Sequence, residues 1–162
     1  KKQIIEDEFL SKTNLESLIN EIIETFKETS SKKILLKTNH DKNKLNFDRS
    51  PELIYGLRNF IGNAVKFSKS TVEIDIISDK QVITLEINDD GPGFPDDIIE
   101  ILGEPYIKSK SINVSSNAGT GLGTFLGKTL LERSGAKLKF SNNKNLNGAE
   151  VNVSWRTKDL RI

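Results

Sequence analysis

Cysteine and methionine are both absent from the 162 residues of the sequence. Because there is no cysteine, the chain can form neither a disulfide nor a cysteine-ligated zinc site, and a reducing compartment is compatible with it. Because there is no methionine, residue 1 is not a translation start, so the chain is either processed or a piece of a longer protein. We expect a piece, since residues 1–9 read as the end of a helix whose beginning is missing.

An excess of charge of either sign is absent as well. Lysine and arginine together number 24, and aspartate and glutamate 23, which gives a formal net charge of +1 at pH 7. This balance favours neither nucleic acid nor an acidic substrate as a partner. No apolar run approaches the length that spans a bilayer, and no signal segment opens the chain. We therefore expect a soluble segment that makes no direct membrane contact.

The first part of the chain predicts one helix and one hairpin. Residues 13–16 have the spacing of a capping box, and apolar residues then recur at helical intervals, so we predict a helix from about Asn14 to Thr29. Short strands are expected over Ile34–Thr38 and Leu45–Phe47. Because only the polar residues 39–43 separate these strands, we predict that they pair with each other.

Two patterns in the middle of the chain predict a pair of strands and a lid. Apolar and polar residues alternate over residues 72–76 and 83–88, which is typical of adjacent antiparallel strands with one buried face. A short helix is expected over Asp96–Leu102. The following residues, 103–119, are polar and small, and a loop of this length in a compact domain is usually functional, so we predict a lid.

The last part of the chain predicts a helix and a second hairpin. The helix should cover Thr124–Ser134 and end at Gly135, and the hairpin should pair Lys137–Ser141 with Glu150–Arg156. Helices that interleave with antiparallel strands imply an α+β fold. We expect a two-layer α/β sandwich with the helices on one face of a mixed sheet.

A helix with an unusual polar stripe is predicted after Ser50, where serine is followed by proline and glutamate. Asn59, Asn63 and Lys66 share one side of this helix. Asparagine is a poor helix former, so two of them one turn apart either serve a nearby cap or turn, or bind a ligand. As ligands, neutral amide oxygens can bind Mg²⁺ without repelling a polyphosphate, and Lys66 can neutralise phosphate oxygens.

Two glycine-rich segments follow. Residues 89–93, Asp-Asp-Gly-Pro-Gly, end a predicted strand, where a carboxylate can accept a hydrogen bond from an exocyclic amine such as that of adenine. The same residues are also typical of an ordinary turn. Residues 119–123, Gly-Thr-Gly-Leu-Gly, precede a predicted helix, whose free N–H groups and partial positive charge favour phosphate. No Gly-Lys-Ser/Thr follows, so this is not a P-loop.

The three motifs, in this order, resemble the N, G1 and G2 boxes of the GHKL ATP-binding superfamily. They are Asn-x-x-x-Asn-Ala-x-Lys-Phe from Asn59, Asp-x-Gly-x-Gly-Phe from Asp89, and Gly-Thr-Gly-Leu-Gly from Gly119. Within the superfamily, the chain is most similar to the catalytic and ATP-binding (HATPase_c) domain of a bacterial sensor histidine kinase. The resemblance covers about residues 14–156 and implies a Bergerat-type ATP-binding fold.

Two further segments, residues 103–106 and 128–136, resemble the RegB/PrrB-type redox-responsive kinases. The resemblance also divides the chain. Residues 14–162 would form the catalytic and ATP-binding domain, and residues 1–13 would be the tail of a preceding dimerisation helix or a linker.

The resemblance implies ATP and Mg²⁺ as cofactors. Asn63 would ligate Mg²⁺, and Asn59 and Lys66 would contact the phosphates. Lys108 would take the place of the family's lid cation near the γ-phosphate and complete an implied catalytic set with Asn59 and Lys66. Asp89 would accept from the adenine amine. The other nucleotide-binding residues that the resemblance implies are Phe67, Gly91, Gly93, Phe94, Tyr106, Gly119, Thr120, Gly121, Leu122, Gly123 and Thr124.

Two positions depart from the family or from its ATP-hydrolysing members. The segment that anchors the lid normally opens with phenylalanine, but this place is Gly103 here, so Tyr106 would anchor the lid instead. Members that hydrolyse ATP, such as Hsp90 and MutL, resemble each other in having a glutamate one turn before the magnesium asparagine. Asn59 stands at that place, and an amide cannot act as a base, so we expect no efficient autonomous hydrolysis.

The resemblance implies that the γ-phosphoryl group is transferred to a histidine on a dimerisation domain, of the same or a partner protein, that this chain lacks. His40 is the chain's one histidine, and it lies in a polar turn without a proline downstream, so we interpret it as a solvated loop residue. A response regulator would act downstream. The domain would belong to the cytoplasmic portion of a membrane-bound sensor.

Two other interpretations remain open. An anti-sigma-factor type serine kinase and binding module of the same superfamily has a similar size. A scaffold that has kept only the fold is disfavoured, because a competent residue fills every phosphate and adenine position.

Overall fold

The computed structural model of the chain describes residues 12–39, 45–102 and 118–160, and for residues 118–122 it describes the backbone alone. The elements follow the order β1 (Lys12–Asn14), α2 (Leu15–Lys27), β2 (Lys33–Thr38), β3 (Asn46–Asp48), α3 (Pro51–Phe67), β4 (Thr71–Ser78), β5 (Val82–Asp89), α4 (Asp96–Leu102), α6 (Ala118–Arg133), β6 (Lys137–Asn142), β7 (Ala149–Arg156) and α7 (Thr157–Leu160).

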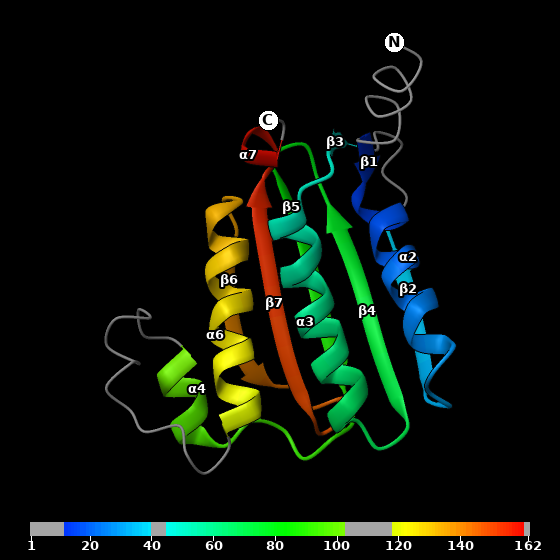
Figure 1. Ribbon diagram of the computed structural model, residues 1–162, viewed down its shortest axis with the longest axis vertical. Helices are drawn as coiled ribbons and strands as arrows, with labels where there is room; N and C mark the ends of the chain where they lie inside the picture. Colours follow the sequence, from blue (N-terminus) through cyan, green and yellow to red (C-terminus); the bar gives the residue numbers. More distant parts are fainter. Residues whose placement is uncertain (1–11, 40–44, 103–117, 161–162) are drawn as a thin grey trace.

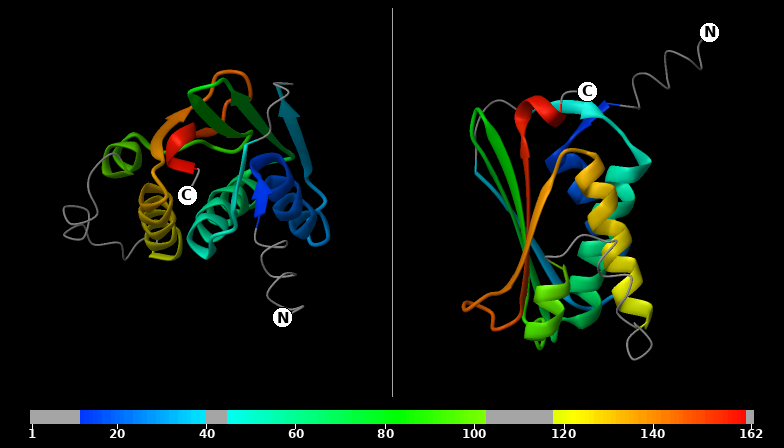
Figure 2. Two further views of the ribbon diagram at one scale, coloured as in Figure 1. Left: turned by 90° about the horizontal axis from the view of Figure 1, so that it is seen from above. Right: turned by 90° about the vertical axis from the view of Figure 1, so that its left-hand side faces the viewer.

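A mixed five-stranded sheet forms one of two layers. Its strand order is β2-β4-β5-β7-β6, in which β2 and β4 are parallel and all other neighbours are antiparallel. Helices α2, α3 and α6 lie side by side on one face of this sheet (Figures 1 and 2). The predicted α+β sandwich, with its helices on one face of a mixed sheet, is therefore confirmed.

The hairpin predicted for the first two strands is wrong. β2 pairs in parallel with β4, and β3 pairs with β1, a strand that the sequence did not predict. Parallel strands need a crossover connection, and here α3 supplies it. In this register Ile34 lies opposite Val72, and Leu36 lies opposite Ile74, so β2 buries its apolar side chains in the main sheet. A partner of three residues could not have done the same.

The other strand pairs and the first two helices agree with the sequence patterns. β4 pairs with β5 and β6 pairs with β7, both antiparallel. The Asn14 side chain caps α2 by accepting from the backbone N–H of Ser17, and the Ser50 side chain caps α3 by accepting from that of Leu53. The short helix α4 has the predicted bounds.

Helix α6 begins earlier than the sequence predicts. Its first residue is Ala118, so the Gly-Thr-Gly-Leu-Gly segment forms the opening turns of the helix rather than a loop before it. Glycine is unfavourable in a helix. Close packing of α6 on α3 offsets this cost, because most helical stability in proteins comes from tertiary contacts.

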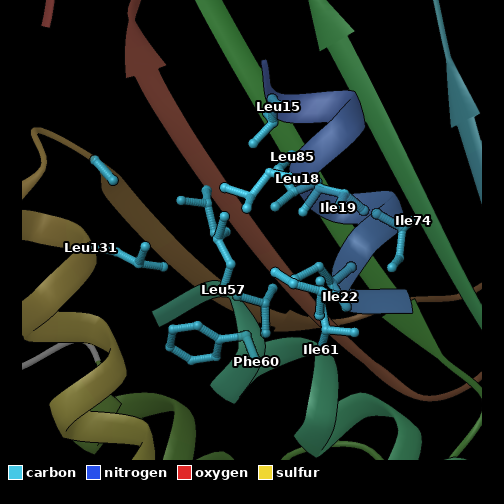
Figure 3. Close-up of a cluster of buried hydrophobic side chains, with 14 of the residues drawn as sticks. Leu15, Leu18, Ile19, Ile22, Leu57, Phe60, Ile61, Ile74, Leu85 and Leu131 are labelled. Carbon is cyan, nitrogen blue, oxygen red and sulfur yellow. The ribbon is translucent and has the colours of Figure 1, made fainter. Parts of the chain in front are cut away.

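The core lies between the helices and the sheet. The buried side chains in Figure 3 come from both layers, and those that are almost completely buried include Leu18, Ile19, Ile22, Leu57, Ile61, Ile74, Leu85 and Leu131. Each buried aliphatic side chain of this size contributes about 1.5–3 kcal/mol. The core thus holds α3 rigidly on the sheet, which fixes the side chains that its polar stripe carries.

Among the helices in the described parts of the chain, none is long and apolar enough to cross a membrane.

Candidate functional site

The polar stripe of α3 meets the first turns of α6. The side-chain amide of Asn63 donates to Asn59 Oδ1 at 3.4 Å and to Thr124 Oγ1 at 3.3 Å. Because its Nδ2 is used in this way, Asn63 Oδ1 is the atom that remains for a ligand. No hydrogen bond to that oxygen exists among the described residues. Three of the predicted residues, Asn59, Asn63 and Thr124, therefore form one cluster.

Small residues on both helices make this cluster possible. A Cβ atom built on Gly123 would lie 3.2 Å from Asn59 Nδ2, and one on Gly127 would lie 3.1 Å from Asn59 Oδ1. Further along, a Cβ atom on Gly56 would lie 2.6 Å from Leu131 Cγ. The helices thus approach more closely than larger side chains would permit, and this approach brings the start of α6 against the asparagines.

Lys66 makes no hydrogen bond to the two asparagines among the described residues. Its ammonium group sits 5.3 Å from the centroid of the Phe67 ring, a cation–π distance. Lys66 is exposed, and the Phe67 side chain is 40% exposed although it is large and apolar. An exposed aromatic ring at a helix end is available to pack against a flat ligand.

Asp89, at the end of β5, is a buried carboxylate that is 4% exposed. Its Oδ1 accepts from the backbone N–H of Gly91 at 2.8 Å and from that of Ala149 at 3.2 Å. Burial raises the pKa of Asp89, and these two N–H groups oppose part of the rise. No hydrogen bond to Oδ2 occurs within the described ranges, so this oxygen can accept one from a ligand.

Two glycines allow the backbone to close around Asp89. A Cβ atom on Gly148 would overlap the backbone carbonyl of Asp89, and one on Gly91 would overlap the carbonyl of Phe67. Asn143 also donates its side-chain amide to the Asp89 carbonyl at 3.1 Å. Gly148 and Asn143 lie in the loop between β6 and β7, and the sequence patterns did not single them out.

Gly93 and Phe94 have structural partners. Gly93 has a φ of +81°, which explains a glycine at this place. Phe94 exchanges two backbone hydrogen bonds with the side chain of Asn142, and its ring stacks edge-on against Phe140 at 6.0 Å. A nucleotide contact by Phe94 stays a prediction.

The turn between α3 and β4 joins the two halves of the site. Asp90 Oδ1 accepts from the backbone N–H groups of Lys69, Ser70 and Thr71. Lys32 donates to three carbonyls at the end of α3. Neither residue was a candidate on sequence grounds, because an acid after Asp89 and a lysine before a strand carry no distinctive pattern.

The site residues lie at one end of the molecule. The C-terminal end of α3, the first turn of α6 and the end of β5 lie together at the lower end of Figure 1. The α3–α6 cluster and Asp89 are linked through Phe67, since its carbonyl lies against Gly91, two residues after Asp89. The ends of α3 and β5, which carry Asn63 and Asp89, thus lie at the same end of the fold, and a common nucleotide site for the two residues stays a prediction.

Part of the predicted site falls outside the description. Tyr106 and Lys108, together with residues 103–117 of the predicted lid, lie outside the described residues, as does His40. Gly119, Thr120, Gly121 and Leu122 are described only as helical backbone. The first four N–H groups of α6 have no partner within the helix, so they are the donors that this segment can offer to phosphate.

Over residues 49–159 the sequence matches the family described as histidine kinase-, DNA gyrase B-, and HSP90-like ATPase. The chain belongs to this family. The match includes α3, Asp89 and α6, that is, every described residue of the candidate site except Lys32. Membership of this ATPase family implies that the domain binds ATP.

Curated relatives of this domain include sensor kinases. The chain is 48% identical over 99 residues to the sensor histidine kinase RegB of Cereibacter sphaeroides, an alignment that covers 58% of this chain and 21% of the relative. It is 29% identical over 97 residues to the sensor histidine kinase CpxA of Escherichia coli K12, covering 55% of this chain and 21% of CpxA. The chain thus spans about a fifth of the length of these curated relatives.

Solved structures agree on the fold. The catalytic domain of histidine kinase ThkA superposes with a TM-score of 0.70 at 18% identity, covering 91% of this chain and 96% of that one. The ATP-binding domain of PrrB from Mycobacterium tuberculosis gives a TM-score of 0.63 at 18% identity, covering 93% and 94%. These two structures, at 18% identity, bear on the fold alone. The resemblance stated from the motifs is confirmed by the family match over residues 49–159, and the similarity to sensor histidine kinases such as RegB agrees with it.

Proposed function

We propose that this domain binds Mg·ATP and transfers the γ-phosphoryl group to a histidine on a dimerisation domain of the same or a partner protein. The observation that carries the proposal is the cluster of Asn59, Asn63 and Thr124 at the start of α6, at the same end of the fold as buried Asp89. The similarity to sensor kinases such as RegB supports histidine as the acceptor.

The adenine base would bind at Asp89. Its Oδ1 is held by two backbone N–H groups, so the carboxylate has a fixed orientation and its Oδ2 can accept from the exocyclic amine. Gly91 leaves room beside the carboxylate, and the exposed ring of Phe67 can pack on the base. Guanine carries an acceptor oxygen where adenine carries this amine, so we expect selectivity for ATP over GTP.

The residues at α3 and α6 fit a magnesium ion bound together with phosphates. Mg²⁺ usually takes only one or two protein ligands and completes its shell with water and phosphate oxygens. Asn63 Oδ1 would be such a ligand, and the ion would neutralise charge on the phosphates. No group of three or more His, Cys, Asp or Glu side chains in the described part of the chain could hold a metal ion, which agrees with an amide ligand rather than an acidic cluster.

Phosphoryl transfer would depend on positioning and charge. Asn59, Lys66 and the N-terminal N–H groups of α6 would hold the phosphates, and the predicted Lys108 would act near the γ-phosphate. Asn59 cannot act as a base toward water, so transfer to an incoming nucleophile is favoured over hydrolysis. A response regulator as the next acceptor, and a place in the cytoplasmic portion of a membrane-bound sensor, remain predictions from the same resemblance.

Calorimetry on the chain and two variants tests nucleotide binding. We expect ATP to bind in the presence of Mg²⁺, and Asn63→Ala and Asp89→Ala to abolish binding. Asn152→Ala provides a matched control, because Asn152 lies on the outer face of β7 and its side chain has no hydrogen bond among the described residues. A folded Asp89→Ala variant with unchanged ATP affinity contradicts the proposed adenine site.

Transfer from γ-labelled ATP tests the acceptor. We expect label on a histidine only after a histidine-bearing dimerisation domain is added. Label on a serine of a small antagonist protein instead would favour the anti-sigma-factor type kinase, which shares the fold and size. Label on His40 of the isolated chain would contradict both.

A further inference from the structure

We propose that Lys32 is a positioning residue for the adenine base: it fixes the C-terminal turn of α3 so that Phe67 and Gly91 keep their places beside Asp89. This inference rests on the proposed function, because it assumes that the base binds there. Lys32 lies just before β2, outside the segment that matches the family.

The contacts of Lys32 are concentrated on one helix end. Its ammonium group donates to the backbone carbonyls of Val65 at 2.6 Å, Lys66 at 3.1 Å and Ser68 at 2.7 Å. The last four carbonyls of a helix have no partner within the helix, and cations near that end also interact favourably with the helix dipole. Two of these acceptors, Val65 and Lys66, belong to the last four carbonyls of α3, and the Val65 carbonyl also accepts from the Ser68 hydroxyl at 2.9 Å. Lys32 thus supplies three donors to the end of this helix.

These carbonyls lie on both sides of Phe67. Of the last four carbonyls of α3, that of Ala64 accepts from the backbone N–H of Ser68 at 2.9 Å, and Lys32 accounts for the next two. The fourth is the carbonyl of Phe67, which lies so close to Gly91 that a Cβ atom there would overlap it. Fixing residues 65, 66 and 68 leaves Phe67 little freedom to move away from Gly91.

A second set of bonds ties the same turn to the sheet. The backbone N–H of Lys33 donates to the Ser70 carbonyl at 2.8 Å, so the start of β2 is attached to the residues that follow α3. The ammonium of Lys32 also lowers the pKa of Asp89 through its charge, although burial has the larger, opposite effect. Lys32 thus holds the backbone beside the base site in place, and its positive charge favours the ionised form of Asp89.

The test compares ATP with GTP. Lys32→Met keeps an unbranched side chain, one atom shorter, but removes its charge and donors. We expect Lys32→Met to bind ATP about tenfold more weakly, equivalent to about 1.4 kcal/mol. Guanine has an acceptor oxygen at the position of the adenine amine, so GTP cannot make this bond to Asp89 in the same pose, and its weaker affinity should change by less than about twofold. Lys32→Arg keeps charge and donors and should restore ATP affinity to within about threefold of the wild type.

Lys33→Met is the matched control. Lys33 is the next residue, is exposed, and its ammonium group has no hydrogen bond or ion pair among the described residues, so ATP and GTP should bind as in the wild type. Thermal unfolding verifies that each variant is folded. If Lys32→Met does not fold, Lys32→Gln, which loses the charge but keeps two N–H donors, gives the same comparison.

Two outcomes overturn the inference. A folded Lys32→Met variant with wild-type ATP affinity shows that the contacts do not position the base site. An equal loss of ATP and GTP affinity shows that Lys32 supports the domain in general and not the adenine base. Absence of ATP binding by the wild type is a different result, because it contradicts the proposed function itself.

Discussion

Asp90 is predicted to stabilise the fold through its negative charge. Its carboxylate accepts four hydrogen bonds within 3.2 Å, from the backbone N–H groups of Lys69, Ser70 and Thr71 and from the Ser70 hydroxyl. These bonds close the turn between α3 and β4 over the end of β5. Asp90→Asn keeps an acceptor oxygen and removes the charge, so it isolates the electrostatic part of this contact.

The pKa of Asp90 sets the size of the effect. Burial by itself raises this pKa, but the N–H and hydroxyl groups of Ser70 and the N–H groups of Thr71 and Lys69 lower it from 3.8 to about 2. Such a shift corresponds to at most about 2.4 kcal/mol of stability at neutral pH. Asp90 is only partly buried, so solvent screening reduces our expectation to about 1–2 kcal/mol.

Urea unfolding of the wild type and Asp90→Asn at several pH values measures this contribution. The folded-state pKa lies below the unfolded-state value, so the stabilisation is present above the unfolded pKa and is lost as pH falls toward 2. We expect Asp90→Asn to lower the unfolding free energy by about 1–2 kcal/mol at pH 6, and by about half of that at pH 3. Asp48→Asn is the control, since Asp48 is exposed and has no side-chain hydrogen bond or ion pair among the described residues.

The electrostatic reasoning is refuted if the loss of unfolding free energy caused by Asp90→Asn is as large at pH 3 as at pH 6. It is also refuted if Asp90→Asn and Asp48→Asn lower the unfolding free energy by the same amount at both pH values.

Three further predictions concern the site and its helices. Gly148→Ala would place a methyl group against the Asp89 carbonyl, so we expect a loss of about 1–3 kcal/mol in urea unfolding and weaker ATP binding by calorimetry. Burial raises the pKa of Asp89, so on acidification ATP affinity should begin to weaken at a higher pH than it would for an aspartate with the ordinary pKa. An ATP affinity that stays constant as the pH falls through the pKa of Asp89 contradicts the role of the ionised carboxylate. Gly56→Val would push its side chain into Leu131 and should lower the unfolding free energy by about 1–3 kcal/mol, whereas unchanged stability would mean that α3 and α6 can separate without cost.

Local patterns were sufficient where the chain pairs with its neighbour in sequence. The alternation over residues 72–88 predicted both the strands and the antiparallel pairing of β4 with β5, and Ser50 marked the start of α3. These signals depend on residues within a few positions of one another. The same reasoning predicts that Asn63 and Asp89 serve one site, because their motifs are distinctive as a set.

Long-range pairing could not be predicted in this way. The two short strands near residue 40 seemed to form a hairpin, but β2 gains a larger apolar partner in β4, which lies beyond α3 in the sequence. β1 has only three residues and therefore no measurable alternation. The glycines at positions 123 and 127 of α6 pack against Asn59, a contact between distant residues that local patterns do not reveal.

The contribution of Lys32 was invisible for a related reason. Its three acceptors lie 33 to 36 residues away, on a helix end whose position only the fold defines. A lysine before a strand is common on protein surfaces, so neither its type nor its spacing distinguishes it.

Amide chemical shifts of the chain on titration with Mg²⁺ and a non-hydrolysable ATP analogue test the central claim most directly. The account predicts large shifts at the backbone N–H groups of Gly91 and Ala149, which hold Asp89, and at the side-chain amides of Asn59 and Asn63. Saturation without shifts at these groups, or shifts confined to outer-face residues such as Asn152, would contradict it.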